Sequence, residues 1–600
     1  MATTSDRDNK DKASAAARGD RRKSAGVRKD YYMIAPAGPG VTRQALIERI
    51  NRADDVEIAL TYKERGTISP PIAVVRASDE GAALLRRSSG GALLIEPDRY
   101  LRAASIMGVS PPSQTMAAIN ALGQEFAVTI RVLAASSQPL ERAEVQIVGE
   151  QGAARGLTDK DGKVELALYG ERPDTISDLF VKPRAGYWGL WRRRPNLQAD
   201  TVNSFTLEPL SLPEGMDWGG KAMRFDRLPA ECRGAEIKIA LIDSGVAISH
   251  KQLTRIDHGI DIRGGGDGRS WSQDAMGHGT PCAGIIGAVA DAAHGVRGYA
   301  PDAELHICRL PADARCSDLV AALDYCLETG IDIACLGFGC ERGSAIVEQR
   351  IAVAKQQGVG IIAAAGNSAG AVLFPACSAH VMAVGAIGQT GNYPEDSPQA
   401  LLAAASVAVA GGLFVPPFSS RGPELDLCAP GAAIVACQSP DGYAVCDGTS
   451  LATAHVAALA ALILAHHGDF RTGFARRDPQ RVERLFQILK DTARPIGHPW
   501  QVGAGLPDAT RALGIQSLPW PLAASVEESL AEMRHAIRQI DRVYAGAGEP
   551  MLFEPPRGPA NVTHLPLNPN PWASLAGRGA EAGVHDLKAA MAMAGLSDRR

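Results

Sequence analysis

The strongest constraint on the fold is a series of short, uninterrupted apolar segments between residues 235 and 515, which alternate with stretches of helical pattern. In chain order these segments read IKIALID, AELHICRL, IDIACLGFG, GVGIIAAAGN, VMAVGAI and ELDLCAPG. A strand that is apolar on both sides needs cover on both faces, which is typical of parallel sheets between two layers of helices. The sequence therefore predicts an α/β domain over 235–515, with helices on both faces of a parallel sheet.

Residues 31–108 have a different pattern and predict a separate, smaller α+β domain. Strand-like and helix-like segments follow one another there in the order βαββαβ, which is the ferredoxin-like split βαβ arrangement. Residues 1–30 are polar and charged, with almost no large apolar side chains. A segment of that composition cannot bury enough apolar surface to fold, so we expect it to be disordered.

Residues 125–210 predict a small β-sandwich. The segments FAVTIRVLA, AEVQIVGE, GKVELALYG and DLFVKP are strand-like and are separated by turn residues. The sequence DKDG, which starts at Asp159, predicts the tight turn of a hairpin. It also looks like half of a calcium loop, but the EF-hand spacing and its terminal glutamate are missing.

Residues 516–600 predict one amphipathic helix within an irregular tail. The helix spans 525–544, opens with a capping box formed by Ser525 and Glu528, and carries a single apolar stripe. We expect this stripe to dock on the chain's own catalytic domain. A partner protein or self-association is the alternative.

Composition excludes some classes of partner. The 600 residues carry a formal net charge of -4 with 21% charged residues, which gives no sign of a nucleic-acid partner. The N-terminus lacks the apolar core of a signal peptide, and we expect no membrane partner because the longest apolar stretches fall short of about 20 residues. The 11 cysteines are an odd number, so a complete disulfide framework within one chain is impossible and a cytoplasmic location is favoured.

Four polar residues lie at the ends of predicted strands or the starts of predicted helices. Ligands of α/β sheets bind at these positions. Asp243 ends the strand IALID, His278 lies in GHGT, Asn367 ends IIAAAGN, and Ser450 lies in GTSLATAH. Taken singly, Asp243 could be a capping or ribose-binding acid and His278 a metal ligand. Asn367 could be a turn residue and Ser450 a helix cap. Together they are the parts of an acyl-transfer site: an orienting acid, a base, an oxyanion donor and a nucleophile.

Ser450 has two interpretations of its own, because serine also caps helices well and the following residues are helix formers. His455, five positions later, points about 140° away from Ser450 on a helix. We therefore expect His455 to be structural and the base to come from elsewhere in the chain.

The chain order Asp, His, Ser is that of subtilisin. From Lys238 to Leu513 the chain resembles the subtilisin-like serine proteases through ALIDSGVAISHKQL, GHGTPCAGIIGA, GYAPDAELHICRL, IIAAAGN, FSSRGPELDLCAPG and GTSLATAHVAALAALIL. The resemblance implies a catalytic triad and an oxyanion hole. The implied residues are Asp243, His278 and Ser450 for the triad, and the Asn367 side chain with the Ser450 backbone N–H for the oxyanion hole.

The same resemblance implies two substrate-binding segments. The first segment is the strand that pairs with the substrate backbone, and it contains Leu336, Gly337 and Phe338. The second segment forms the wall of the primary specificity pocket, and it contains Ala364, Ala365 and Gly366. Phe338 stands where the family usually has a second glycine, which would narrow the cleft. An added loop is expected at 388–417. No cofactor is expected, and calcium, common in the family, has no identifiable site.

The N-terminal α+β domain resembles the propeptide domain of this family, which implies folding assistance and inhibition of the active site. The expected function is that of a cytoplasmic serine endopeptidase acting on proteins or peptides and autoregulated by this domain. Two alternatives stay open: a peptide-maturing transpeptidase or macrocyclase, and an inactive protease fold that serves as a scaffold.

Overall fold

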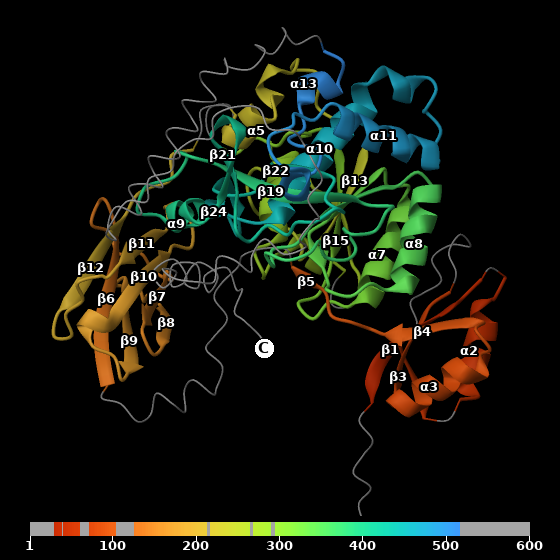
Figure 1. Cartoon of the computed structure of the whole chain (residues 1–600), viewed down its shortest axis with the longest axis horizontal. Coiled ribbons are helices and arrows are strands. Elements are labelled where there is room, and N and C mark those ends of the chain that lie inside the picture. The colour runs from red at the N-terminus through yellow and green to blue at the C-terminus, as the bar shows by residue number, and fades with distance from the viewer. Residues whose placement is uncertain are drawn as a thin grey trace, which may run out of the picture.

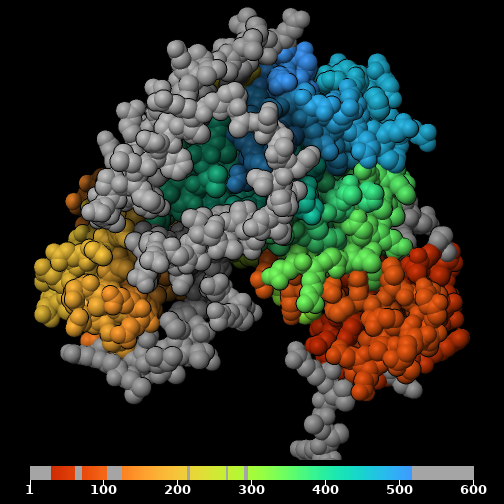
Figure 2. All heavy atoms as spheres, viewed as in Figure 1, coloured from red at the N-terminus to blue at the C-terminus, as the bar shows by residue number. Residues whose placement is uncertain are grey.

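The computed structural model describes residues 29–38, 40–53, 55–60, 71–103, 125–212, 216–264, 268–289 and 295–515. They form a central unit, an N-terminal unit (β1 to β5) and a sandwich unit (β6 to β12), and the two smaller units contact different parts of the central one (Figures 1 and 2). The helix predicted at 525–544 and nearly all of the segment predicted to be disordered lie outside the described residues.

The central unit is built on a sheet whose parallel strands are the predicted apolar segments together with one further edge strand, β14. In spatial order the parallel strands are β14 (His258–Asp261), β15 (Glu304–Arg309), β13 (Lys238–Asp243), β16 (Ile333–Leu336), β18 (Gly360–Ala364), β19 (Met382–Gln389) and β22 (Leu427–Pro430). This confirms the predicted α/β class.

Helices cover both faces of this sheet. One face packs against α6 (Gly279–Gly287), α10 (Thr449–His466) and α11 (Pro479–Asp491), and the other packs against α7 (Cys316–Thr329) and α8 (Ala345–Gln356). Successive strand residues point to opposite faces. In β13, accordingly, Ile239 and Leu241 belong to the first core, and Ala240 and Ile242 belong to the second.

The insertion at 388–417 adds antiparallel strands to the predicted parallel sheet, so the complete sheet is mixed. It contains α9 (Pro398–Ala404) and the strands β20 (Val407–Val409) and β21 (Leu413–Val415), and β21 pairs antiparallel with β19. The insertion is therefore an ordered extension of the sheet and not a plain loop.

The N-terminal unit has the order strand, helix, strand, strand, helix, strand. Its elements are β1 (Asp30–Pro36), α2 (Arg43–Asn51), β2 (Val56–Leu60), β3 (Ala73–Ala77), α3 (Asp79–Ser88) and β4 (Leu93–Pro97), in an antiparallel sheet of order β2-β3-β1-β4. Thr42 and Ser78 begin the two helices by accepting backbone N–H groups. A short strand, β5 (Arg102–Ala103), then leaves this unit and pairs with β17 (Phe338–Gly339) of the central unit.

The sandwich unit has two sheets, of order β11-β10-β7-β8 and β12-β6-β9. Its strands are β6 (Glu125–Ala134), β7 (Glu144–Gly149), β8 (Ala153–Leu157), β9 (Lys163–Tyr169), β10 (Ile176–Lys182), β11 (Leu190–Arg193) and β12 (Val202–Leu207). The tight turn lies at Asp159 as predicted, with Asp159 Oδ1 accepting the amides of Asp161 and Lys163. It is not a hairpin turn, because it joins β8 and β9, which belong to different sheets.

The remaining elements complete the central unit. They are the antiparallel pair β23 (Ile434–Gln438) and β24 (Gly442–Cys446), and the short helices α5 (Trp218–Ala222), α12 (Pro499–Val502) and α13 (Ala509–Ala512). Helix α10 is long and apolar enough to cross a membrane by length and composition, but 89% of it is buried inside the fold. It is therefore the core helix of the central unit, and β24 leads directly into it.

Candidate active site

An acid and an imidazole meet at the carboxyl edge of the parallel sheet. Asp243 is the last residue of β13, and His278 precedes the first turn of α6. His278 Nδ1 lies 2.5 Å from Asp243 Oδ1, and the same oxygen accepts the Ser244 amide at 2.7 Å. Both side chains are buried. The contact leaves Nε2 as the ring nitrogen that faces away from the carboxylate.

A second acid, which the sequence analysis missed, holds the loop that carries His278. Asp274 is buried and accepts from Ser244 Oγ at 2.8 Å, from the Gly277 amide at 2.8 Å, and from the Thr280 amide and hydroxyl at 2.8 and 2.6 Å. It therefore ties the end of β13 to the start of α6. Its only sequence signal is an acid shortly before the GHGT motif, and acids are common in such loops.

Two glycines allow the backbone to approach this pair closely. A Cβ at Gly337 would lie 2.4 Å from Asp243 Oδ2 and 2.9 Å from His278 Cε1. A Cβ at Gly279 would lie 2.2 Å from the Gly245 carbonyl oxygen. No larger residue fits either position without displacing the acid or the imidazole loop.

Ser450 lies in the first turn of the core helix α10, but it does not cap that helix. The helix begins at Thr449 and Gly448 is its N-cap, so Ser450 is the second residue of the helix. The first N–H groups of a helix have no intrahelical acceptor, and the positive end of the helix dipole lies there. Cys282 of α6 lies beside the Ser450 hydroxyl, and burial raises the pKa of the Cys282 thiol well above its ordinary value.

Asn367, just beyond β18, is held by the residue that precedes the serine. Asn367 Oδ1 accepts the Thr449 amide at 3.0 Å and the Thr449 hydroxyl at 2.9 Å. Its Nδ2 is buried and donates to no other described residue. Thr449, which the sequence analysis did not single out, thus fixes the amide so that its nitrogen is left as a donor beside Ser450.

The two predicted substrate-binding segments lie next to these residues. β17, which begins at Phe338, is already paired with a strand, since Phe338 lies opposite Ala103 of β5. The Phe338 ring meets the His278 ring edge-on with centroids 5.7 Å apart. In the second segment, the Gly366 amide donates to Thr449 Oγ1 at 3.2 Å, which links this wall to the serine helix.

His455 does not take part in the site. Its Nδ1 lies 2.8 Å from the Leu451 carbonyl oxygen one turn earlier in α10, and its ring packs against Tyr299. Burial lowers the pKa of His455, which keeps the imidazole neutral. The structural role expected for this histidine agrees with these contacts.

No metal site is found in the described part of the chain. Within those residues, no three His, Cys, Asp or Glu side chains are grouped so as to hold a metal ion. The 11 cysteines are all free thiols, and most of them are buried among apolar side chains.

These contacts define a class of protein. The carboxyl edge of the parallel sheet carries an imidazole bound to a carboxylate, and an anchored amide is bound to the residue that precedes a serine in the first turn of a buried helix. These are the groups that serine hydrolases use.

Comparison with known proteins narrows the class. The model of the Subtilase family matches residues 234–508. Subtilisin BL of Lederbergia lenta is 33% identical over 286 residues, which cover 46% of this chain and 91% of that protein. Subtilisin DY of Bacillus licheniformis is 29% identical over 298 residues, which cover 48% of this chain and 95% of that protein. Subtilisin Savinase of Lederbergia lenta is 32% identical over 286 residues, which cover 46% of this chain and 91% of that protein. The chain belongs to the subtilase family and is a subtilisin-like serine endopeptidase, a hydrolase whose substrates are peptides.

Proposed function

We propose that Ser450 is the nucleophile of this endopeptidase and that His278 and Asp243 activate it. His278 accepts the Ser450 proton as Oγ attacks the scissile carbonyl, and later gives that proton to the leaving amine. Asp243 holds the imidazole in the required tautomer and stabilises the imidazolium. The Asn367 amide and the Ser450 backbone N–H stabilise the oxyanion, and the acyl-enzyme on Ser450 is then hydrolysed by water.

The observation that carries this proposal is the buried 2.5 Å contact between His278 Nδ1 and Asp243 Oδ1. A histidine fixed through Nδ1 presents Nε2 as the base, and an acid in this position favours the charged ring that forms during attack. The anchoring of Asn367 through its oxygen supports the same reading, because a donor aimed before the reaction needs no reorganisation.

The test is fluorophosphonate labelling combined with peptide hydrolysis, with Ser450→Ala beside the wild type. The proposal expects the wild type to be labelled once per chain and to hydrolyse a peptide, and expects Ser450→Ala to do neither. An unlabelled, inactive wild type would instead support a scaffold. Product masses separate hydrolysis from transpeptidation, since hydrolysis adds one water to the products and transpeptidation adds none.

We further propose that substrate backbone pairs with the strand around Phe338 and that Ala364, Ala365 and Gly366 line the primary pocket. The support is the pairing of β5 with β17: the chain's own Arg102–Ala103 segment forms an antiparallel ladder at Phe338 and Gly339. A second peptide cannot use the same ladder while β5 occupies it.

The N-terminal unit would accordingly inhibit the enzyme. Two carboxylates of the N-terminal unit, which lie at the starts of helices of the central unit, hold this unit beside β17. Glu96 accepts the Ala345 and Ile346 amides at 3.1 and 3.0 Å at the start of α8, and Asp98 accepts the Ser317 amide and hydroxyl at 3.0 and 2.8 Å at the start of α7. Carboxylates are favoured at these positive helix ends.

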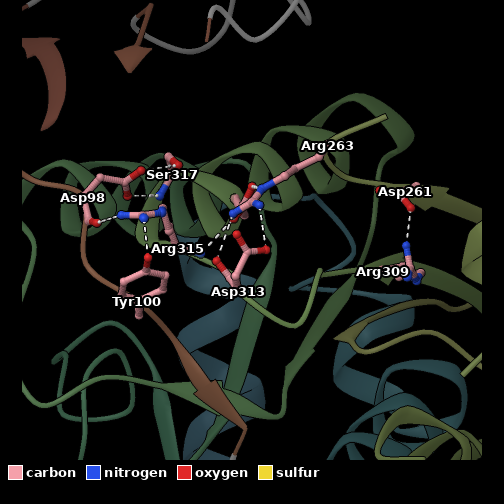
Figure 3. A network of polar contacts seen from close by, with 9 residues as sticks. Asp98, Tyr100, Asp261, Arg263, Arg309, Asp313, Arg315 and Ser317 are labelled. Carbon is pink, nitrogen blue, oxygen red and sulfur yellow. Dashed lines mark hydrogen bonds and ion pairs between the residues drawn. The ribbon is translucent and has the colours of Figure 1, made fainter. Parts of the chain in front are cut away.

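Arg315 adds a third anchor between the two units, shown in Figure 3 beside Asp98 and Tyr100. Its guanidinium lies 4.6 Å from the ring centroid of Tyr31 and 4.0 Å from that of Tyr100. It also donates to the Asp98 carbonyl oxygen at 2.9 Å and to Tyr100 Oη at 2.6 Å. Leu101, which follows, is buried in the core that contains Phe338.

Mass spectrometry of purified wild type beside Ser450→Ala tests this autoregulation. The proposal expects the wild type to cut its own chain in the segment between β5 and β6 and the serine variant to stay whole. A wild type that is fully active while uncut and still bound to its N-terminal unit would contradict inhibition.

A further inference from the structure

The sandwich unit is joined to the central unit through the insertion that carries α9. The Trp191 amide donates to the Asp396 carbonyl oxygen at 2.6 Å, and Arg192 Nη1 lies 2.5 Å from Asp396 Oδ2. Phe180 of β10 is buried within the central unit's main core. Asp396 lies two residues before α9, so the sandwich unit holds the start of that helix.

A second contact from the sandwich unit reaches the strand that leads into Ser450. The Gly186 amide donates to the Tyr443 carbonyl oxygen in β24 at 2.8 Å. The positive charge of Lys182, at the end of β10, acts on Asp447. β24 ends at Cys446, so both contacts lie in the segment that leads into the first turn of α10.

The contact through α9 continues to Asp447, three residues before Ser450. Gln399 on α9 is buried, and its Nε2 donates to Asp447 Oδ2 at 2.8 Å. Asp447 Oδ1 accepts the Ala433 amide at 2.7 Å. The turn between β24 and α10 is thus held on one side by the Ala433 amide, just before β23 of the central unit, and on the other by Gln399 of the insertion.

We propose that Gln399 is a positioning residue for Ser450, and that the sandwich unit keeps it in place through α9. This inference rests on the proposed role of Ser450 as nucleophile. Catalytic groups must stay within about 0.5 Å of their productive geometry, and supporting hydrogen bonds provide that precision. The insertion and the sandwich unit then form a permanent part of the catalytic apparatus, even if the N-terminal unit is released.

The first experiment replaces Gln399 by leucine, which keeps the side chain's bulk and removes the hydrogen bond. We expect kcat to fall about tenfold with KM nearly unchanged, because a misplaced nucleophile impairs reaction more than binding. Leu157→Ala is the matched control, since Leu157 is an exposed side chain of the sandwich unit. It should leave both kinetic constants unchanged.

The second experiment exchanges the hydrogen-bond donor and acceptor between residues 399 and 447. Gln399→Glu alone sets two carboxylates against each other and should lower kcat further. Adding Asp447→Asn restores one donor and one acceptor, because the new amide can donate to the glutamate while its oxygen still accepts from Ala433. We expect the double variant to recover most of the lost kcat. A purely structural role would move the melting temperature without this recovery.

The outcomes separate this inference from the proposed function. If Ser450→Ala abolishes labelling while Gln399→Leu has wild-type kcat, the positioning role is wrong and the assignment of Ser450 stands. If Gln399→Leu lowers kcat but the double variant recovers none of it, the positioning role is also wrong. If Ser450→Ala keeps full activity, the proposed function fails before the question of positioning arises.

Discussion

The two smaller units contact the central unit in different ways. The N-terminal unit approaches through side-chain carboxylates on helix starts, one arginine between two tyrosines and a strand of two residues. The sandwich unit instead places Phe180 inside the main core and adds the backbone contacts of Trp191 and Gly186. Both contacts also have an apolar part: Met33, Ala35, Ile72 and Leu101 of the N-terminal unit are buried in the core that contains Phe338, and Phe180 is buried in the main core.

The polar and apolar parts of these contacts differ in what their loss costs. When a polar contact opens, water replaces the partner at each helix start, so the net cost of each lost hydrogen bond is only about 0.5–1.5 kcal/mol. When a buried aromatic side chain leaves a core, the lost apolar contact has no such replacement. On release, water can thus replace the polar anchors of the N-terminal unit, but it cannot replace the apolar contacts of Leu101 or of Phe180 in the sandwich unit.

The largest expected effect comes from removing the apolar anchor of the sandwich unit. Phe180→Ala should lower the free energy of unfolding by about 3–5 kcal/mol, because it leaves a cavity in the main core. Denaturant unfolding of the full chain in the Ser450→Ala background measures this without self-digestion. A loss no greater than that of the exposed control Leu157→Ala would mean that Phe180 is not the apolar anchor of the sandwich unit.

A smaller effect is expected from removing both carboxylates of the N-terminal unit. Glu96→Ala with Asp98→Ala should weaken its contact by about 2–4 kcal/mol, since each removes an acceptor of the first amides of one helix. The rate of fluorophosphonate labelling of the uncut chain should therefore rise. An unchanged labelling rate would argue that β5 is held by other contacts.

The contact of the N-terminal unit should also depend on pH through Asp98. Burial raises the pKa of Asp98 to about 6, against an ordinary value of 3.8. Burial outweighs the Ser317 hydrogen bonds and the charge of Arg315, so the contact favours the neutral acid although Asp98 lies at a helix start. The contact is therefore strongest below about pH 3.8 and weakens as pH rises to about 6. Hydrogen exchange at the Leu101 amide, which donates to the Ala314 carbonyl oxygen at 2.7 Å, measures this in Ser450→Ala after correction for intrinsic rates.

Asp98→Asn is the control for this pH effect. The asparagine keeps an oxygen for the Ser317 amide but does not titrate. Protection at Leu101 should then stay constant from about pH 4 to pH 7. A pH dependence that survives in Asp98→Asn would assign the effect to another group.

The smallest expected effect concerns an exposed ion pair beside β5. Arg102 and Glu341 lie 3.8 Å apart, with side chains 73% and 77% exposed. Solvent screens such pairs, so Arg102→Ala should change neither labelling nor stability by more than about 0.5 kcal/mol. A larger change would show that the strand pairing at Gly339 depends on this charge.

Much of the fold was predictable because local patterns report burial directly. The apolar segments that became β13, β16 and β18 are short and continuous, and such strands have few places to lie other than the interior of a covered parallel sheet. The antiparallel strands β20 and β21 escaped prediction, since three residues carry too little pattern to distinguish a strand from a loop.

The candidate site was predictable where its residues lie within motifs. Asp243, His278 and Asn367 lie in glycine-containing turns at strand and helix ends. The order Asp243, His278, Ser450 along the chain matches one known arrangement. Asp274 and Thr449 were missed because their roles are hydrogen bonds to neighbouring loops. Nothing in their spacing separates them from ordinary turn residues.

The sequence by itself determined the α/β class of the central unit and the motif order of its site, because both depend on periodicity and on short turns. Only the tertiary structure decided that Gln399 meets Asp447, 48 residues away, and that Phe180 of one unit is buried in the core of another. Such contacts depend on how whole units pack, and no local pattern of side chains encodes that packing.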